Sequence, residues 1–258
     1  MSITRRDFVR LAGMGATAAA AGLTTASADT GRPEPQAASG GLSAEERGIH
    51  PILEKDHPYL FIDSCMQIWP DAPFADAHRY GATVYGVTSW DPHLGVDQAL
   101  EGLMFWHAVA RKHPNLAVVT KAAEIPDLKK AGRSGLLLAS QCGDFMGDKI
   151  HRLEAFYGLG LRMLIFAYSQ SNRLCGGCLD QADGGLTSLG ELAVAECNRL
   201  GLLLDCSHVG ARSALEIIER SAQPTVFSHS GADAVSPNPR NIDDDRIKAC
   251  AAKGGVVG

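Results

Sequence analysis

The chain has 258 residues, of which 45% are hydrophobic and 21% are charged, and its formal net charge is -5 at pH 7. These values are ordinary for globular proteins, so the chain can bury one sizeable core. A negative net charge provides no basic field for nucleic acid, and the sequence contains no helix-turn-helix, RNA-binding signature or phosphate-binding loop. We therefore expect no nucleic-acid partner.

Residues 1–28 have the three parts of an export signal in their usual order. The twin arginines Arg5 and Arg6 precede a mildly apolar stretch over residues 11–23, and Ala26-Ser27-Ala28 has the pattern of a cleavage site. An ordinary N-terminal helix with a chance arginine pair is the alternative, but it leaves the order of the three parts unexplained. The stretch is too short to span a bilayer. The sequence thus predicts a twin-arginine signal peptide, export to the periplasm or the cell exterior, and no stable membrane span.

A linker and one barrel domain are expected after the signal. Residues 29–57 begin rich in Gly, Pro, Ser and Ala, which is typical of a linker. Apolar runs then occur at residues 58–63, 82–88, 116–119, 134–141, 160–168, 202–208, 224–230 and 255–258. Helical patterns occur between them, at residues 96–111, 125–131, 148–157, 189–200, 212–221 and 244–253. This alternation predicts a parallel sheet and an α/β fold, a TIM-like (β/α) barrel over residues 58–258. Because the sequence stops inside the last run, whereas a barrel needs closure and an exposed strand edge is unfavourable, we expect the barrel to be C-terminally incomplete.

Two of the expected strands end in the same dipeptide, Ser207-His208 and Ser228-His229. One helical stretch separates them, and a right-handed crossover of this length makes the two strands parallel. Both histidines should then emerge at the carboxyl edge of the sheet, where α/β proteins place their chemistry. Neutral imidazole is the commonest nitrogen ligand of metals. A loop hydrogen bond is the alternative for each histidine, but their repetition at equivalent places favours a metal site.

The seven cysteines include one closely spaced pair, Cys175-Gly-Gly-Cys178. Such a pair can be a redox centre or half of a zinc site. There is no second C-x-x-C, and the surrounding Gly, Asn and Asp residues are typical of a loop. We therefore expect a structural disulfide or a plain loop here rather than catalysis.

Several further motifs follow one another in the second half of the chain. They are Leu153-Glu154-Ala155-Phe156-Tyr157-Gly158, Glu196-Cys197-Asn198-Arg199-Leu200-Gly201, Asp205-Cys206-Ser207-His208, Phe227-Ser228-His229-Ser230, Pro239-Arg240-Asn241 and Gly254-Gly255-Val256-Val257-Gly258. In this order they closely resemble the renal (membrane) dipeptidase family, over roughly residues 58–258 and most strongly from residue 150 onward. The resemblance implies a TIM-like barrel that carries a two-zinc site and hydrolyses dipeptides.

The resemblance assigns roles to three residues of the second half. His208 and His229 match the two histidines that hold one zinc ion in that family. Arg240 matches an arginine that grips the carboxylate of the dipeptide, and a guanidinium fork offers the two parallel charge-assisted bonds that this task needs. A loop-capping role is the alternative for Arg240.

The other half of the site departs from the family pattern. Cys65 stands in the region of the family's first His-x-Asp, Gln141 at the bridging glutamate, and Tyr168 at a histidine that contacts the substrate. A neutral amide lacks the negative charge that holds two cations together. We therefore expect one zinc ion rather than two, with Cys65 and Gln141 as further candidate ligands beside the histidine pair. Additional ligands could come from Asp63, Asp71 or His78.

The leading hypothesis is an exported zinc-dependent dipeptidase-like hydrolase that cleaves dipeptides or related small amides with a metal-activated water. The alternative is a catalytically impaired family member that binds small carboxylate ligands. A redox protein that uses Cys175 and Cys178 ranks last, because the pair has no thioredoxin-like context. The expected partner is a small dipeptide-like substrate, and the sequence leaves a homodimer open.

Overall fold

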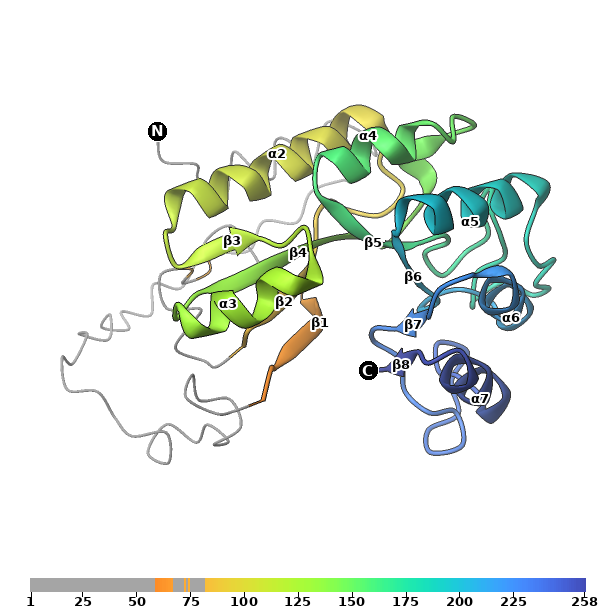
Figure 1. The fold of residues 1–258 in the computed structure, drawn as a ribbon. Helices are drawn as coiled ribbons and strands as arrows, with labels where there is room; N and C mark the ends of the chain where they lie inside the picture. The colour runs from red at the N-terminus through yellow and green to blue at the C-terminus, as the bar shows by residue number, and fades with distance from the viewer. Residues whose placement is uncertain (1–58, 67–71, 73, 75–81) are drawn as a thin grey trace, which may run out of the picture.

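Figure 1 shows a computed structural model of the chain, which describes residues 59–66, 72, 74 and 82–258. The expected signal peptide at residues 1–28 and the linker at residues 29–57 lie outside the described residues, as do Asp71 and His78. None of the helices in the described part of the chain combines the length and the hydropathy that a bilayer span requires.

A single sheet of eight parallel strands forms the middle of the molecule. The strands are β1 (Ile62–Met66), β2 (Val84–Thr88), β3 (Leu116–Val118), β4 (Ser134–Ser140), β5 (Leu161–Ile165), β6 (Leu203–Asp205), β7 (Val226–Phe227) and β8 (Val256–Val257). Across the sheet they follow the order β1-β2-β4-β5-β6-β7-β8, while β3 pairs with β4 beside this path. The order never reverses, as it would in a doubly wound sheet, so the predicted TIM-like barrel topology is confirmed.

The sheet curves round without closing through its described strands. β1 and β8 are the two ends of the hydrogen-bonded path and do not pair with each other in the described part of the chain. A side chain nevertheless connects β1 to the last part of the sheet, because Ser64 Oγ donates a hydrogen bond, at 2.7 Å, to the backbone oxygen of Ser228, the residue after β7. The carboxyl ends of β1 and β7 thus face a common region.

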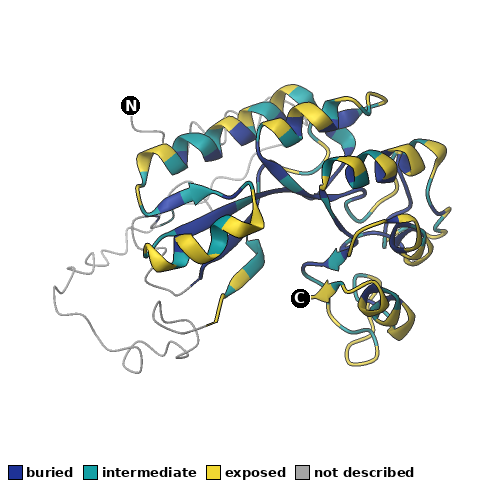
Figure 2. Ribbon diagram, in the orientation of Figure 1, coloured by how far each residue is buried: buried dark blue, intermediate teal, exposed yellow. Residues whose placement is uncertain are grey.

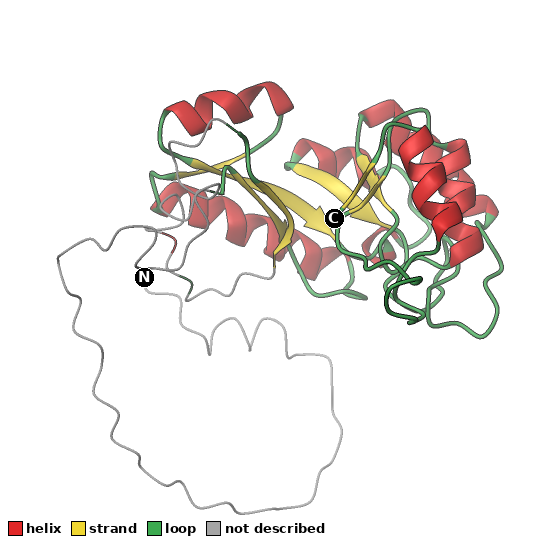
Figure 3. Ribbon diagram, turned by 90° about the horizontal axis from the view of Figure 1, so that it is seen from below, coloured by secondary structure: helices red, strands yellow, loops and turns green. Residues whose placement is uncertain are grey.

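The helices lie around the strands (Figure 3). They are α2 (Val96–Lys112), α3 (Ile125–Lys130), α4 (Arg152–Gly158), α5 (Ser188–Leu200), α6 (Ala211–Arg220) and α7 (Asp244–Ala252), with short 3-10 helices η3 (Ala122–Glu124) and η4 (Asp144–Met146). Each helix packs through a stripe at helical spacing; in α2 the buried residues are Ala99, Leu103, Trp106 and Val109. Figure 2 shows the middle strands buried and the outer helix faces exposed.

The strand boundaries differ from the predicted ones at the two Ser-His sequences. β6 ends at Asp205 and β7 at Phe227, so both histidines lie in the loops that follow the strands. The physical reason is local: the Ser207 N–H bonds to the side chain of Asp205, at 2.9 Å, which turns the chain out of the sheet. The carboxyl-edge position predicted for both histidines is confirmed.

Candidate metal centre at the carboxyl edge of the sheet

His208 and His229 converge where β6 and β7 end. Their Nε2 atoms lie 3.0 Å apart, and both rings are half-buried. Two nitrogens that bind one zinc ion at about 2.0–2.1 Å in tetrahedral geometry lie roughly 3.3 Å from each other. The two rings are therefore arranged nearly as they would be around a shared ion.

Each ring is held by a hydroxyl group at its other nitrogen. Nδ1 of His208 lies 2.8 Å from Ser169 Oγ, and Nδ1 of His229 lies 2.7 Å from Ser228 Oγ. His208 is further fixed by its backbone, which has the left-handed φ of 64° that few residues other than glycine adopt. A hydrogen bond at the far nitrogen decides which ring nitrogen is free to bind a metal.

A buried carboxylate, that of Asp205, connects these loops. Its Oδ1 atom accepts hydrogen bonds from the backbone N–H groups of Ser207, at 2.9 Å, and Ser228, at 3.1 Å, and its Oδ2 atom accepts from the Ser228 hydroxyl. Because that hydroxyl gives its only proton to Asp205, its oxygen must accept the Nδ1–H of His229. The Nε2 atom of His229 then carries a lone pair directed at His208, which is the tautomer that a metal ligand requires.

Burial also keeps both imidazoles neutral. Burial, with smaller contributions from the charges of Arg240 and His229 in the same direction, lowers the pKa of His208 to about 3. Burial lowers the pKa of His229 as well; the carboxylate of Asp205 opposes this shift and Arg240 adds to it. Both rings are therefore uncharged at neutral pH and able to bind a cation.

Arg240 lies beside this pair. Its guanidinium donates to the backbone oxygen of His229, at 2.9 Å, and to Ser230 Oγ, at 3.0 Å. These two bonds agree with loop capping, the alternative role that the sequence leaves open for Arg240. A guanidinium has five N–H donors, so this bracing leaves other donors for a ligand, and the predicted grip on a carboxylate stays a prediction.

Cys65 and Gln141 meet at the ends of β1 and β4. The amide nitrogen of Gln141 lies 3.1 Å from Cys65 Sγ and donates to Thr88 Oγ1 at 2.8 Å. Burial, together with the charge of Asp205, raises the pKa of Cys65 to about 11, so the thiol is protonated at neutral pH unless a cation replaces the proton. The hydrogen bond from Ser64, next to Cys65, to the backbone oxygen of Ser228, next to His229, places this half close to the histidine half.

Tyr168, after β5, stacks on the ring of His208, with the ring centroids 4.1 Å apart and an angle of 27° between the planes. Its ring also meets His93 edge-on, with the centroids 6.0 Å apart. Tyr168 thus lies between the histidine pair and a second group of polar side chains.

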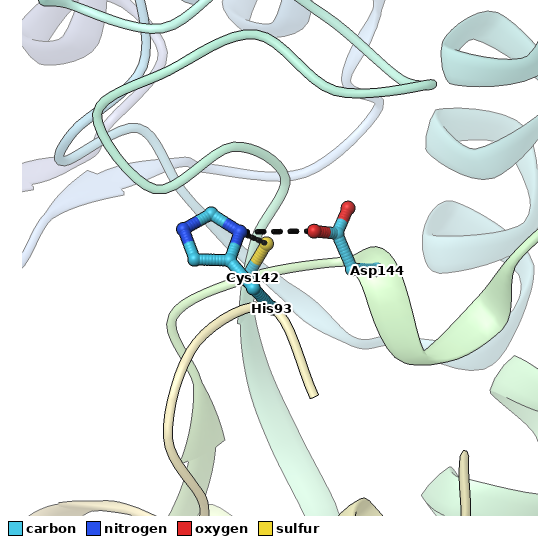
Figure 4. A group of neighbouring side chains, drawn as sticks. All are labelled: His93, Cys142 and Asp144. Carbon is cyan, nitrogen blue, oxygen red and sulfur yellow. Dashed lines mark hydrogen bonds and ion pairs between the residues drawn. The ribbon is translucent and has the colours of Figure 1, made fainter. Parts of the chain in front are cut away.

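That second group is a trio formed by His93, Cys142 and Asp144, shown in Figure 4. Nδ1 of His93 lies 3.0 Å from Asp144 Oδ2 and 3.8 Å from Cys142 Sγ. The sequence interpretation missed these residues. The signal that could have found them is their place shortly after β2 and β4, the same strand-end rule that identified His208 and His229.

Cys175 and Cys178 form a plain loop with both thiols free. Cys175 is buried and pairs with Leu186 through an isolated backbone bridge, while Gly177 does the same with Val209. Burial raises the pKa of the Cys175 thiol, which disfavours the reactive thiolate. Of the two expectations for this pair, the loop agrees with the structure.

Comparison with known proteins points in the same direction as this geometry. The model of a family described as membrane dipeptidase (peptidase family M19) matches residues 71–258. The chain is 31% identical over 165 residues to Dipeptidase 3 of Mus musculus and 30% identical to that of Homo sapiens. Each match covers 62% of this chain and 33% of the relative, so the chain spans about one third of the length of these curated relatives.

Solved structures share the fold. An amidohydrolase from Pseudomonas aeruginosa superposes with a TM-score of 0.73 at 30% identity, over 77% of this chain and 61% of that one. A metallo peptidase from Rhodobacter sphaeroides, liganded with a phosphinate mimic of the dipeptide L-Ala-D-Ala, gives a TM-score of 0.66 at 21% identity, over 77% of this chain and 73% of that one. This second likeness concerns the fold alone.

Proposed function

Because the chain belongs to the membrane dipeptidase family, peptidase family M19, we propose that it is an exported zinc-dependent dipeptidase-like hydrolase that cleaves dipeptides or related small amides. The observation that carries this proposal is the distance of 3.0 Å between the Nε2 atoms of His208 and His229 at the carboxyl edge of the barrel. The relatives named dipeptidases support the substrate class.

The residues present fit one zinc ion better than two. The histidine pair supplies two neutral nitrogens with directed lone pairs, and Cys65 is the candidate third ligand, because its thiol can exchange a proton for a metal. Gln141 carries no charge with which to bridge two cations. When bound, zinc polarises a carbonyl group and lowers the pKa of a coordinated water toward neutrality.

The chain's own residues position the substrate and the ligands. Asp205 and Ser228 hold the lone pair of His229 toward His208. The guanidinium of Arg240, braced on the His229 loop, is placed to take the carboxylate of a dipeptide through its remaining donors. Tyr168 covers one face of His208 and thereby limits access of water to that side of the ring.

The proposal is tested by hydrolysis of simple dipeptides by the full chain after removal of metal and addition of zinc. Slow zinc-dependent release of amino acids is expected, because Cys65 and Gln141 are weaker ligands than His and an acid. Arg240→Lys should raise KM more than it lowers kcat, since lysine offers no fork to the carboxylate. His151→Ala, at an exposed histidine before α4, is the matched control and should change neither constant.

The binding-protein alternative is favoured by one observation, the amide at position 141. Zinc-loaded protein that binds dipeptides through Arg240 but never cleaves them would establish this alternative and overturn the hydrolase proposal. Absence of both binding and cleavage would reject both.

Export is part of the same proposal and rests on the signal-peptide pattern of residues 1–28. Changing Arg5 and Arg6 to lysine is expected to leave the precursor in the cytoplasm, because the twin-arginine route recognises that pair, whereas the unmodified chain should yield a mature form that begins at Asp29. Fractionation followed by N-terminal sequencing measures both results. Arg10→Lys, in the same charged segment, is the matched control, and equal export of the double-lysine variant would exclude the route.

A further inference from the structure

We propose that His93, Cys142 and Asp144 form a second, separate binding site for one zinc ion (Figure 4). The three side chains come from two places in the barrel, the loop after β2 and the turn after β4 that leads into η4. Neither the histidine pair nor Gln141 takes part in this trio, so the proposal stands apart from the hydrolase function.

The three donor atoms converge on one point. Cys142 Sγ and Asp144 Oδ2 both approach Nδ1 of His93, at 3.8 Å and 3.0 Å. A cysteine nucleophile activated by a histidine and an acid needs the thiol at one ring nitrogen and the carboxylate at the other. Here both approach the same nitrogen, whose single proton or lone pair cannot serve two partners well. A cation between the three atoms would contact all of them.

The distances match a zinc ion in approximately tetrahedral geometry. Zinc bonds of about 2.0–2.1 Å to nitrogen, 2.0–2.2 Å to oxygen and 2.3 Å to sulfur place pairs of ligand atoms roughly 3.3–3.6 Å apart. The distances of 3.0 Å and 3.8 Å in the trio bracket this range, and all three donor atoms lie within 4.8 Å of one another.

An outer partner already orients two of the ligands. The amide nitrogen of Asn172 donates to Asp144 Oδ1, at 2.9 Å, and to the backbone oxygen of Phe166, at 2.6 Å, and it lies 3.7 Å from Cys142 Sγ. This bond holds one carboxylate oxygen and leaves Oδ2 directed at His93. Such outer hydrogen bonds are characteristic of metal sites, because they fix the ligands before the ion binds.

Charge and softness select the kind of ion. A thiolate and a carboxylate together neutralise a divalent cation, and a thiolate with an imidazole favours zinc over the hard cations magnesium and calcium. Cys142 is buried, whereas the His93 side chain is 51% exposed. The trio therefore lies partly at the surface, where a solvent water can serve as an exchangeable fourth ligand.

Cobalt(II) titration of the full chain, followed by absorption spectroscopy, tests the site. Cobalt occupies zinc sites with similar geometry, and a cysteine ligand gives a thiolate-to-cobalt band in the near ultraviolet. The titration is made in a Cys65→Ser background, so that the Cys65 thiolate near the histidine pair cannot contribute to the absorption band. We expect one equivalent of this band, displaced by added zinc.

Three variants in that background decide the outcome. Cys142→Ser should remove the band, and His93→Ala, at an exposed position that does not threaten the fold, should weaken cobalt binding at least tenfold. His208→Ala with His229→Ala should leave the band in place. A missing band in the Cys65→Ser protein, a band unchanged by Cys142→Ser or His93→Ala, or a band lost with the histidine pair would each overturn the proposal.

Discussion

Replacing His208 or His229 with alanine is expected to abolish zinc binding at the histidine pair, and zinc-dependent hydrolysis with it. Either change removes one of the two imidazole ligands of the ion. The other candidate ligands are weak, because Cys65 is a protonated thiol and Gln141 is a neutral amide. The comparison is made in a His93→Ala background, so that the trio of His93, Cys142 and Asp144 does not contribute zinc. The zinc content, measured by elemental analysis, should fall from close to one equivalent to close to none.

Two comparisons make this prediction specific. His151→Ala should keep its zinc, because this histidine is exposed and lies outside the centre. Gln141→Glu should increase the affinity for a second ion only modestly, since a new carboxylate still lacks other strong ligands on its side. Two tightly bound ions in the His93→Ala protein, with vigorous dipeptide hydrolysis, would mean that other residues provide the ligands and that the roles given to Cys65 and Gln141 are wrong.

The second large effect is expected at Asp205, which is 2% exposed. Asp205→Ala leaves the N–H groups of Ser207 and Ser228 without this partner, whereas the Ser228 hydroxyl can turn to Nδ1 of His229. Each buried unpaired group costs roughly 1–3 kcal/mol, so the free energy of unfolding should fall by about 2 kcal/mol or more. Urea denaturation followed by circular dichroism measures this loss.

Asp205→Asn separates positioning from stability. The amide oxygen can still accept the two N–H groups, so most of the stability should remain. The amide nitrogen, however, can only donate to Ser228 Oγ, which then turns its own proton toward Nδ1 of His229. The ring proton moves to Nε2 and blocks the lone pair, so zinc affinity should fall about 10- to 100-fold. Unchanged zinc affinity in this variant would show that Asp205 only supports the fold.

The sequence predicted the parts of the site that follow a simple rule. Strand-end position and repetition identified His208 and His229, because a parallel sheet brings every carboxyl end to the same edge. The same rule applies to His93, but this residue stands alone after Pro92, five residues beyond the end of β2, and no repetition marks it. Its proximity to Cys142 arises from the loop conformation, which no spacing in the sequence encodes.

Asp205 shows a different limit of sequence reasoning. A single acid at the end of an apolar run is compatible with a solvated strand end, a metal ligand or a buried acceptor, and the sequence does not distinguish these. Only the fold reveals that three donors of two neighbouring loops surround it. The strand lengths were overestimated for the same reason, since these side-chain hydrogen bonds compete with pairing in the sheet.

The hydrogen bond from Ser64 to the backbone of Ser228 has a consequence for the order of folding. It joins positions 164 residues apart, whereas His208 and His229 are separated by only 21 residues within one strand-helix-strand unit. Closing a longer loop costs more chain entropy, so contacts within the unit should form earlier than the docking of β1. The histidine pair would then bind its ion in a partly folded chain. β1, which carries Cys65, would pack against the centre only afterwards, when the ion is already bound.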